Sequence, residues 1–177
     1  TLDRPTRRSL VRGLAACALL ARSLPAVASD RRIVALGGAI TEILYRLGRE
    51  GEIVGVDSTS QYPPQARAVK ADVGYVRALG AEGLLSLRPT LVLATEGAGP
   101  PQVLALIAQS GVPVVRVPEE ASETGVVERI RIVSASVGAL PEGAALADEV
   151  GAAFASLARA RAALSRAKRV LFVLSLQ

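Results

Sequence analysis

Short apolar runs alternate with amphipathic stretches through most of the chain. The apolar runs are rich in branched residues and only five or six residues long, which is typical of buried β-strands rather than of helices. They cover residues 32–36, 52–56, 90–94 and 112–117. A short extended piece is also expected at 72–76.

Between these runs, hydrophobic residues recur at the spacing of amphipathic helices. The clearest helix covers residues 39–47, where four apolar side chains fall on one face and Gly48 follows as a stop signal. Further helices are expected at 81–87, 103–109 and 122–137. The segment 57–65 is polar and contains two prolines, and we expect it to be a loop.

The alternation of strands with helices predicts an α/β fold over residues 31–140. The strands are continuous apolar runs, which indicates a parallel, Rossmann-like sheet covered on both faces. Ligands bind beyond the carboxyl ends of the strands in such sheets. The loops expected at those ends are Gly37-Gly38, 57–64, 72–77 and 96–101.

A long Ala-rich stretch over residues 141–166 predicts one helix of about 38 Å at helical rise. Several larger side chains fall near one stripe of it: Val150, Phe154, Leu157, Arg161 and Leu164. The helix leads into the apolar run 170–176, which predicts a strand. We therefore expect 141–168 to connect two α/β lobes, and 169–177 to be the first strand of a second, truncated lobe. A last packing helix of a single domain is the alternative.

Residues 1–28 have the order of regions found in secretory signal peptides. Residues 6–12 are basic, 13–20 are apolar, and the small residues of an A-x-A pattern end at Ala28. This pattern predicts cleavage after Ala28. The apolar run is too short to span a bilayer. The pair Arg7-Arg8 also resembles a twin-arginine signal, which leaves the export route open. A disordered basic tail is the alternative interpretation.

Composition and charge exclude several classes of protein. The net charge is +5, but only 3% of the residues are aromatic and the basic residues form no single block. Stacking platforms for bases are missing, so we expect no nucleic-acid partner. The one cysteine excludes an internal disulfide and Cys-rich zinc or iron–sulfur sites.

Few residues of the sequence form motifs that are known to catalyse reactions or to bind nucleotides or metals. The chain has no histidine for acid–base work, no G-x-S-x-G motif and no paired carboxylates at the predicted strand ends, so we expect no enzyme. Gly37-Gly38 is not followed by the rest of a dinucleotide-binding motif or by a P-loop lysine. Tyr75 is among the very few side chains that could hold a metal centre.

Three stretches carry a resemblance to a known family: RIVALGGAITEILYRLG, IVGVDSTSQYPPQA and DVGYVRALGAEGLLSLRPTLVLA. They resemble the N-terminal lobe of haemin-binding periplasmic proteins of ABC importers, in a group that includes cobalamin- and siderophore-binding proteins. The resemblance runs in order from Arg31 to Gln177. It implies a periplasmic protein that captures haem between two lobes and delivers it to a membrane permease.

The resemblance also implies roles for single residues. Tyr75, in the segment V-G-Y-x-R, would be the axial ligand of ferric haem, because a phenolate is a hard anionic donor that suits Fe(III). Arg77 would favour that phenolate or bind a haem propionate. We expect the two side chains to face one cleft, because residues two apart on an extended segment point the same way.

Two further residues have implied roles with open alternatives. Tyr62 would stack on the edge of the macrocycle, or it packs only on its neighbouring prolines. Glu82 would dock on arginines of the permease, or it serves the dipole of its helix.

A cobalamin or a ferric siderophore is the alternative ligand. The cobalamin-binding relatives carry Trp where Tyr75 stands, and this chain has no Trp, which weakens the cobalamin interpretation. The siderophore interpretation stays open, because Arg77 could bind an anionic iron chelate.

Overall fold

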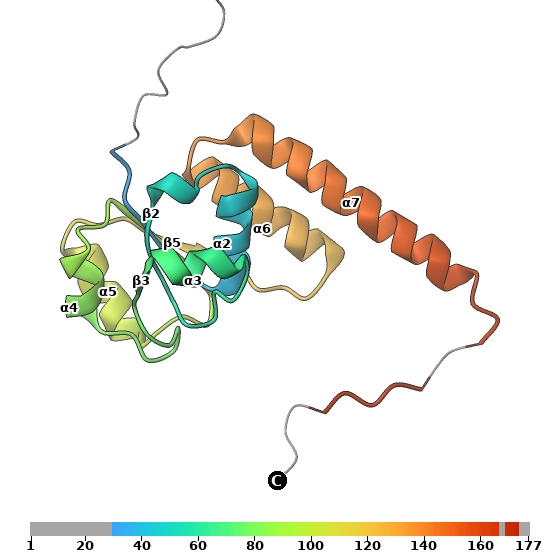
Figure 1. Ribbon diagram of the computed structural model, residues 1–177, viewed down its shortest axis with the longest axis horizontal. Helices are drawn as coiled ribbons and strands as arrows, with labels where there is room; N and C mark the ends of the chain where they lie inside the picture. The colour runs from blue at the N-terminus through green and yellow to red at the C-terminus, as the bar shows by residue number, and fades with distance from the viewer. Residues whose placement is uncertain (1–29, 167–168, 174–177) are drawn as a thin grey trace, which may run out of the picture. The chain divides into compact units, whose positions relative to one another are not determined.

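The computed structural model describes residues 30–166 and 169–173 (Figure 1). The predicted signal peptide, residues 1–28, lies outside the described residues. The strands are β1 (Ile33–Leu36), β2 (Ile53–Val56), β3 (Ala71–Asp72), β4 (Leu91–Thr95) and β5 (Val114–Val117). The helices are α2 (Gly38–Arg46), the 3-10 helix η1 (Glu50–Glu52), α3 (Pro64–Val69), α4 (Ala81–Ser86), α5 (Pro101–Gln109), α6 (Glu123–Ser136) and α7 (Leu140–Ala162). No helix in the described ranges is both long and apolar enough to cross a membrane.

Strands β1 to β5 form an all-parallel sheet in the order β3-β2-β1-β4-β5. This confirms the predicted Rossmann-like α/β lobe. The chain builds outward from β1 to β3, and then returns to the other side of β1 for β4 and β5. The strand order therefore reverses between β1 and β4, which is where open α/β sheets bind ligands.

Alternate residues of the central strands β1 and β4 enter two hydrophobic cores on opposite faces of the sheet. In β1, Ile33 and Ala35 join the core formed with α2, α6 and α7. Val34 and Leu36 join the core formed with α4 and α5. All four residues are fully buried. Because helices cover both faces (Figure 1), the central strands β1 and β4 are buried at every position.

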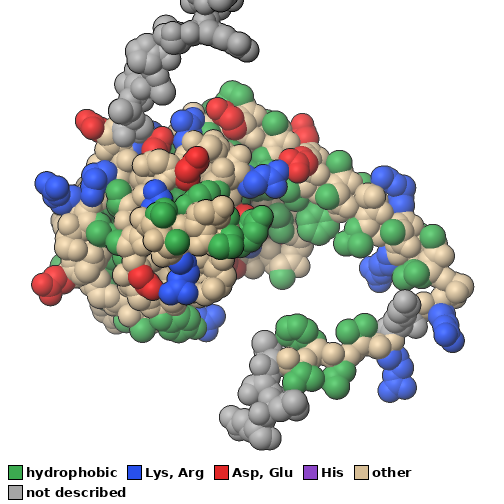
Figure 2. Space-filling view, viewed as in Figure 1, with side chains coloured by type: hydrophobic (Ala, Val, Ile, Leu, Met, Phe, Trp, Pro, Cys, Tyr) green, Lys and Arg blue, Asp and Glu red, His purple; other side chains and the backbone are tan. Residues whose placement is uncertain are grey.

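The first half of α7 packs on the lobe and the second half extends past it. Leu146 and Ala147 are buried in the same core as α6, and Arg46 of α2 forms a 2.7 Å ion pair with Glu149. Further along, Leu157 is 64% exposed. Figure 2 shows apolar and basic side chains along this distal part. The predicted long helix is confirmed, although it ends at Ala162 rather than near residue 166.

Three details differ from the sequence-based expectations. The expected loop at 57–65 ends early, because Pro64 begins helix α3. Proline is suited to the first turn of a helix, since the N–H that it lacks would have no partner within the helix there. The extended piece at 72–76 contributes only Asp72 to a strand, in β3. Of the predicted strand 170–176, residues 170–173 form neither helix nor strand, and no described strand pairs with them; the remainder lies outside the described residues.

Close packing between α6 and α7 depends on Gly143. A Cβ atom built at Gly143 would collide with the side chain of Ser134, whereas one at Gly151 would meet nothing within 4 Å. We expect Gly143→Ala to lower the free energy of unfolding by about 1–3 kcal/mol, because the two helices must separate. The matched substitution Gly151→Ala, in the same helix, should be neutral or stabilising by up to ~1 kcal/mol. Urea unfolding of both variants checks this, and equal effects would contradict it.

Candidate functional site

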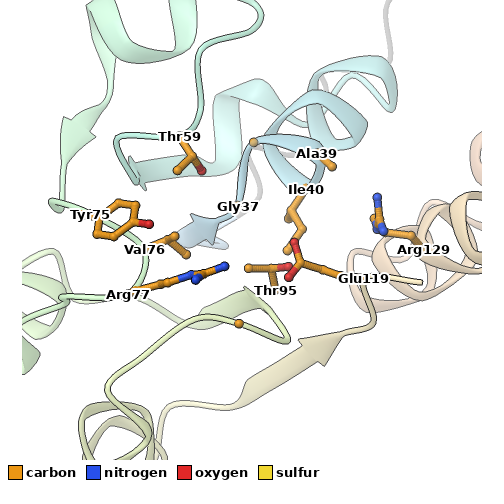
Figure 3. A pocket seen from close by; sticks show the side chains of 12 residues that line it. Gly37, Ala39, Ile40, Thr59, Tyr75, Val76, Arg77, Thr95, Glu119 and Arg129 are labelled. Atoms are coloured by element: carbon orange, nitrogen blue, oxygen red, sulfur yellow. The ribbon is translucent and has the colours of Figure 1, made fainter. Parts of the chain in front are cut away.

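A cavity of about 230 Å³ lies at the carboxyl ends of the central strands, where the strand order reverses. Figure 3 shows the side chains that surround it. They come from the ends of β1 and β4, from the loops after β2, β3 and β5, and from α2 and α6. The lining residues are Gly37, Gly38, Ala39, Ile40, Thr59, Tyr75, Val76, Arg77, Thr95, Gly97, Glu119 and Arg129.

The two glycines after β1 let three backbone segments meet at the base of this pocket. Gly37 has a φ of 125°, and a Cβ atom there would lie 3.0 Å from the Cβ of Thr95. A Cβ atom at Gly38 would lie 2.6 Å from the carbonyl oxygen of Thr59. Larger residues would push the ends of β1, β2 and β4 apart. Gly37 and Gly38 therefore allow the backbone after β1 to lie close to Thr95 and Thr59. They do not form part of a nucleotide-binding motif.

A buried carboxylate holds the loop after β2 against the end of β1. Asp57 is fully buried, and its oxygens accept hydrogen bonds from Gly37 N at 2.7 Å, Thr59 N at 2.8 Å and Ser60 Oγ at 3.0 Å. The Thr59 hydroxyl donates a further bond at 2.5 Å. Ser60 is in turn 2.8 Å from the hydroxyl of Thr41 in α2. Asp57 thereby fixes the positions of Gly37 and Thr59, which both line the pocket.

The segment that carries Tyr75 is fixed on both sides by backbone hydrogen bonds. Ser58 N donates to the carbonyl of Gly74 at 2.9 Å, which joins this segment to the loop held by Asp57. Gly99 N donates to the carbonyl of Val76 at 2.9 Å, and Val76 itself is buried in the core. The Tyr75 side chain between these anchors is 49% exposed and lines the pocket.

The structure brings Tyr75 and Arg77 to the same pocket, but not for the expected reason. The chain turns after Tyr75, whose carbonyl accepts a 2.8 Å hydrogen bond from Ala78 N, so this is not an extended segment. Val76 points into the core between the two side chains. Arg77 makes no hydrogen bond or ion pair with any described residue. Its guanidinium extends into the pocket (Figure 3), where it can bind an anion.

Three polar pocket residues lie outside the loops that the sequence indicated: Thr95, Glu119 and Arg129. Thr59 lies in the expected loop 57–64, but it was not singled out there. Thr59 and Thr95 provide hydroxyl groups at the ends of β2 and β4. Glu119 follows β5, a strand whose loop was not counted among the carboxyl-end loops, although it ends at the same edge of the sheet. Arg129 belongs to α6, and only the packing of that helix beside β5 places it here.

The structure does not bring Tyr62 or Glu82 into this pocket. Tyr62 lies in the loop before α3, is 61% exposed and is not among the lining residues. Glu82 lies in the first turn of α4 and is exposed, as both of its expected roles require.

Asp72 supports the turn that precedes Tyr75. It accepts hydrogen bonds from Gly74 N and from the Arg67 guanidinium, both at 2.8 Å. These bonds, the Gly74 bond first, hold the pKa of the Asp72 carboxyl below its ordinary value. Its stabilising contribution is therefore complete above the unfolded pKa of about 3.9, and is lost as the pH falls through the lowered folded pKa.

We expect Asp72→Asn to lower the urea midpoint slightly at neutral pH, because the carboxyl is half exposed and its pairing is screened by water. The difference between variant and parent should shrink as the pH falls below about 3.9, the ordinary pKa of an aspartate, because the contribution of the charged carboxyl is then progressively lost. A difference that stays constant from pH 7 to pH 3 would contradict this account of Asp72.

The chain belongs to the periplasmic binding protein family, whose model matches residues 33–177. A vitamin B12-binding protein of Vibrio cholerae is 36% identical over 93 residues, which are 52% of this chain and 32% of that protein. The family consists of solute-binding proteins, which are not enzymes.

Two solved structures are similar over most of the chain. The periplasmic heme-binding protein RhuT from Roseiflexus sp. RS-1 is 40% identical, with a TM-score of 0.75 over 78% of this chain and 52% of that one. The periplasmic heme-binding protein HutB of Vibrio cholerae is 32% identical, with a TM-score of 0.69 over 74% of this chain and 50% of that one. The chain thus spans about a third of this vitamin B12-binding protein and about half of each of these two solved proteins.

Proposed function

We propose that this protein captures haem in the periplasm and delivers it to the permease of an ABC importer. One observation carries the proposal: a phenol and a guanidinium with no described partner, Tyr75 and Arg77, line one pocket at the switch point of the sheet. Structures of heme-binding proteins that are 40% and 32% identical to this chain support the choice of ligand.

In this proposal Tyr75 supplies the phenolate that coordinates the ferric iron. A phenolate is a hard anionic donor that suits Fe(III). Because Arg77 pairs with none of the described residues, it is also available to pair with a propionate of the haem.

The remaining roles lie outside the pocket. Tyr62 contacts the edge of a ligand that protrudes from the pocket, and Glu82 docks on the permease. Residues 31–140 form the first lobe, and residues 141–168 connect it to a second lobe that begins near residue 169. Residues 1–28 direct export by the general or the twin-arginine route.

A cobalamin or siderophore binder is the second candidate, and one observation favours it. The curated relative that matches this chain at 36% identity binds vitamin B12. An anionic ferric siderophore would also find a counter-charge in Arg77.

Calorimetric titration of the full-length protein with haemin, cyanocobalamin and a ferric hydroxamate siderophore separates these ligands. We expect haemin to bind with a dissociation constant of about 1 µM or tighter, which corresponds to about 8 kcal/mol. The other two should not bind measurably at the same concentrations. Saturable binding of cobalamin or siderophore without binding of haemin would overturn the proposal.

A further inference from the structure

The pocket combines two guanidinium groups with a single carboxylate. Among the side chains that line it, the charged ones are Arg77, Arg129 and Glu119. In Figure 3 the Glu119 carboxylate lies between the two guanidinium groups and is directed toward the cavity. An acidic side chain at this place needs an explanation, because the proposed ligand is itself an anion.

The backbone around Glu119 is held firmly. The preceding carbonyl, that of Pro118, accepts a 3.1 Å hydrogen bond from Arg129 Nε. The carbonyl of Val117, at the end of β5, accepts a 3.0 Å bond from Glu96 N in the neighbouring strand segment. Glu119 is therefore carried to the pocket by the end of β5.

Glu119, in the loop after β5, and Arg77, in the loop after β3, both extend their side chains toward Gly97. A Cβ atom built at Gly97 would lie 3.3 Å from Glu119 Oε2 and 3.9 Å from Arg77 Nη2. Even so, the carboxylate makes no ion pair or hydrogen bond with any described residue. No described residue therefore neutralises the negative charge of Glu119, and this charge can act on a ligand in the cavity.

We propose that Glu119 sets the number of carboxylates that the site accepts. The inference rests on the proposed function in haem binding. The two guanidinium groups match the two propionates of haem. A ferric tetrapyrrole with four carboxylates carries two further negative charges, and the negative charge of Glu119 disfavours that ligand by longer-range repulsion. Glu119 thus selects a dicarboxylate tetrapyrrole over a tetracarboxylate one.

The test compares two ligands in the full-length protein and its Glu119→Gln variant. Dissociation constants are measured by absorption titration with haemin and with iron(III) coproporphyrin, which carries four carboxylates. The variant should shift the ratio of affinities toward the coproporphyrin by about three- to tenfold, as expected for a partly solvated like charge. The shift should nearly vanish at ~1 M ionic strength, where charges are screened within about 3 Å.

Glu96→Gln is the matched control, because Glu96 is an exposed carboxylate at the end of the neighbouring strand and does not line this pocket. It should leave the ratio unchanged. If the parent binds haemin and both variants give the parent's ratio, or the same shift, the role of Glu119 is overturned while haem binding stands. If the parent does not bind haemin, the proposed function and this inference both fail.

Discussion

Tyr75→Phe should abolish the tyrosinate-type absorption spectrum of the ferric haem complex. The substitution removes one oxygen atom, and the 49% exposed ring can keep its place between its two backbone anchors. The fold should be unaffected, whereas the ferric iron should lose the ligand that we propose for it. We expect the affinity for haemin to fall at least about tenfold, or ~1.4 kcal/mol. Haemin titration followed by absorption measures both effects.

Tyr62→Phe is the control for this experiment. Tyr62 is exposed and lies outside the pocket lining, and the substitution preserves an aromatic ring for stacking. It should retain the parent spectrum and affinity. An unchanged spectrum in Tyr75→Phe, with haemin still bound, would show that Tyr75 is not the ligand and would make Tyr62 the next residue to test.

Asp57→Ala should destabilise the lobe by about 2–4 kcal/mol, because it leaves several buried donors without an acceptor. The amide of Gly37 loses its acceptor, and the hydroxyl of Ser60 keeps only the hydroxyl of Thr41 as a partner; both groups are buried in the packed lobe. The same change releases Thr59 from the pocket wall. Affinity for haemin should therefore fall along with stability.

Urea unfolding of the ligand-free protein measures the first effect. Asp148→Ala is the control, because Asp148 is an exposed aspartate of α7 without a described partner. It should change the free energy of unfolding by no more than about 0.5 kcal/mol. Equal stabilities of the two variants would show that the Asp57 network contributes little.

The strands and most helices could be predicted from the sequence because each depends on a local pattern. The continuous apolar runs of β1 and β4 follow directly from burial on both faces of the sheet. Helix α3 was missed for a local reason as well, since Pro63-Pro64 is as compatible with the start of a helix as with a loop.

The pocket could be predicted only in part, because its residues are separated in sequence and meet through the strand order. Tyr75 and Arg77 were identified from a resemblance to known proteins, and a turn rather than an extended segment brings them together. Glu119 and Arg129 could not be assigned, because periodicity does not say that β5 lies next to β4. Once that order is known, the loop after β5 becomes an obvious place to look.

The pocket wall is assembled from strand ends that are far apart along the chain, such as Gly37, Thr59, Tyr75, Thr95 and Glu119. None of these residues is adjacent in sequence to the next, so a chain that has not yet paired β4 with β1 has no binding site. A ligand that binds only the complete lobe must stabilise it by mass action, by about 2.7 kcal/mol at a hundredfold excess over the dissociation constant. The bound ligand would then favour the folded state, and the ligand-bound protein should resist heat and proteolysis better than the ligand-free protein.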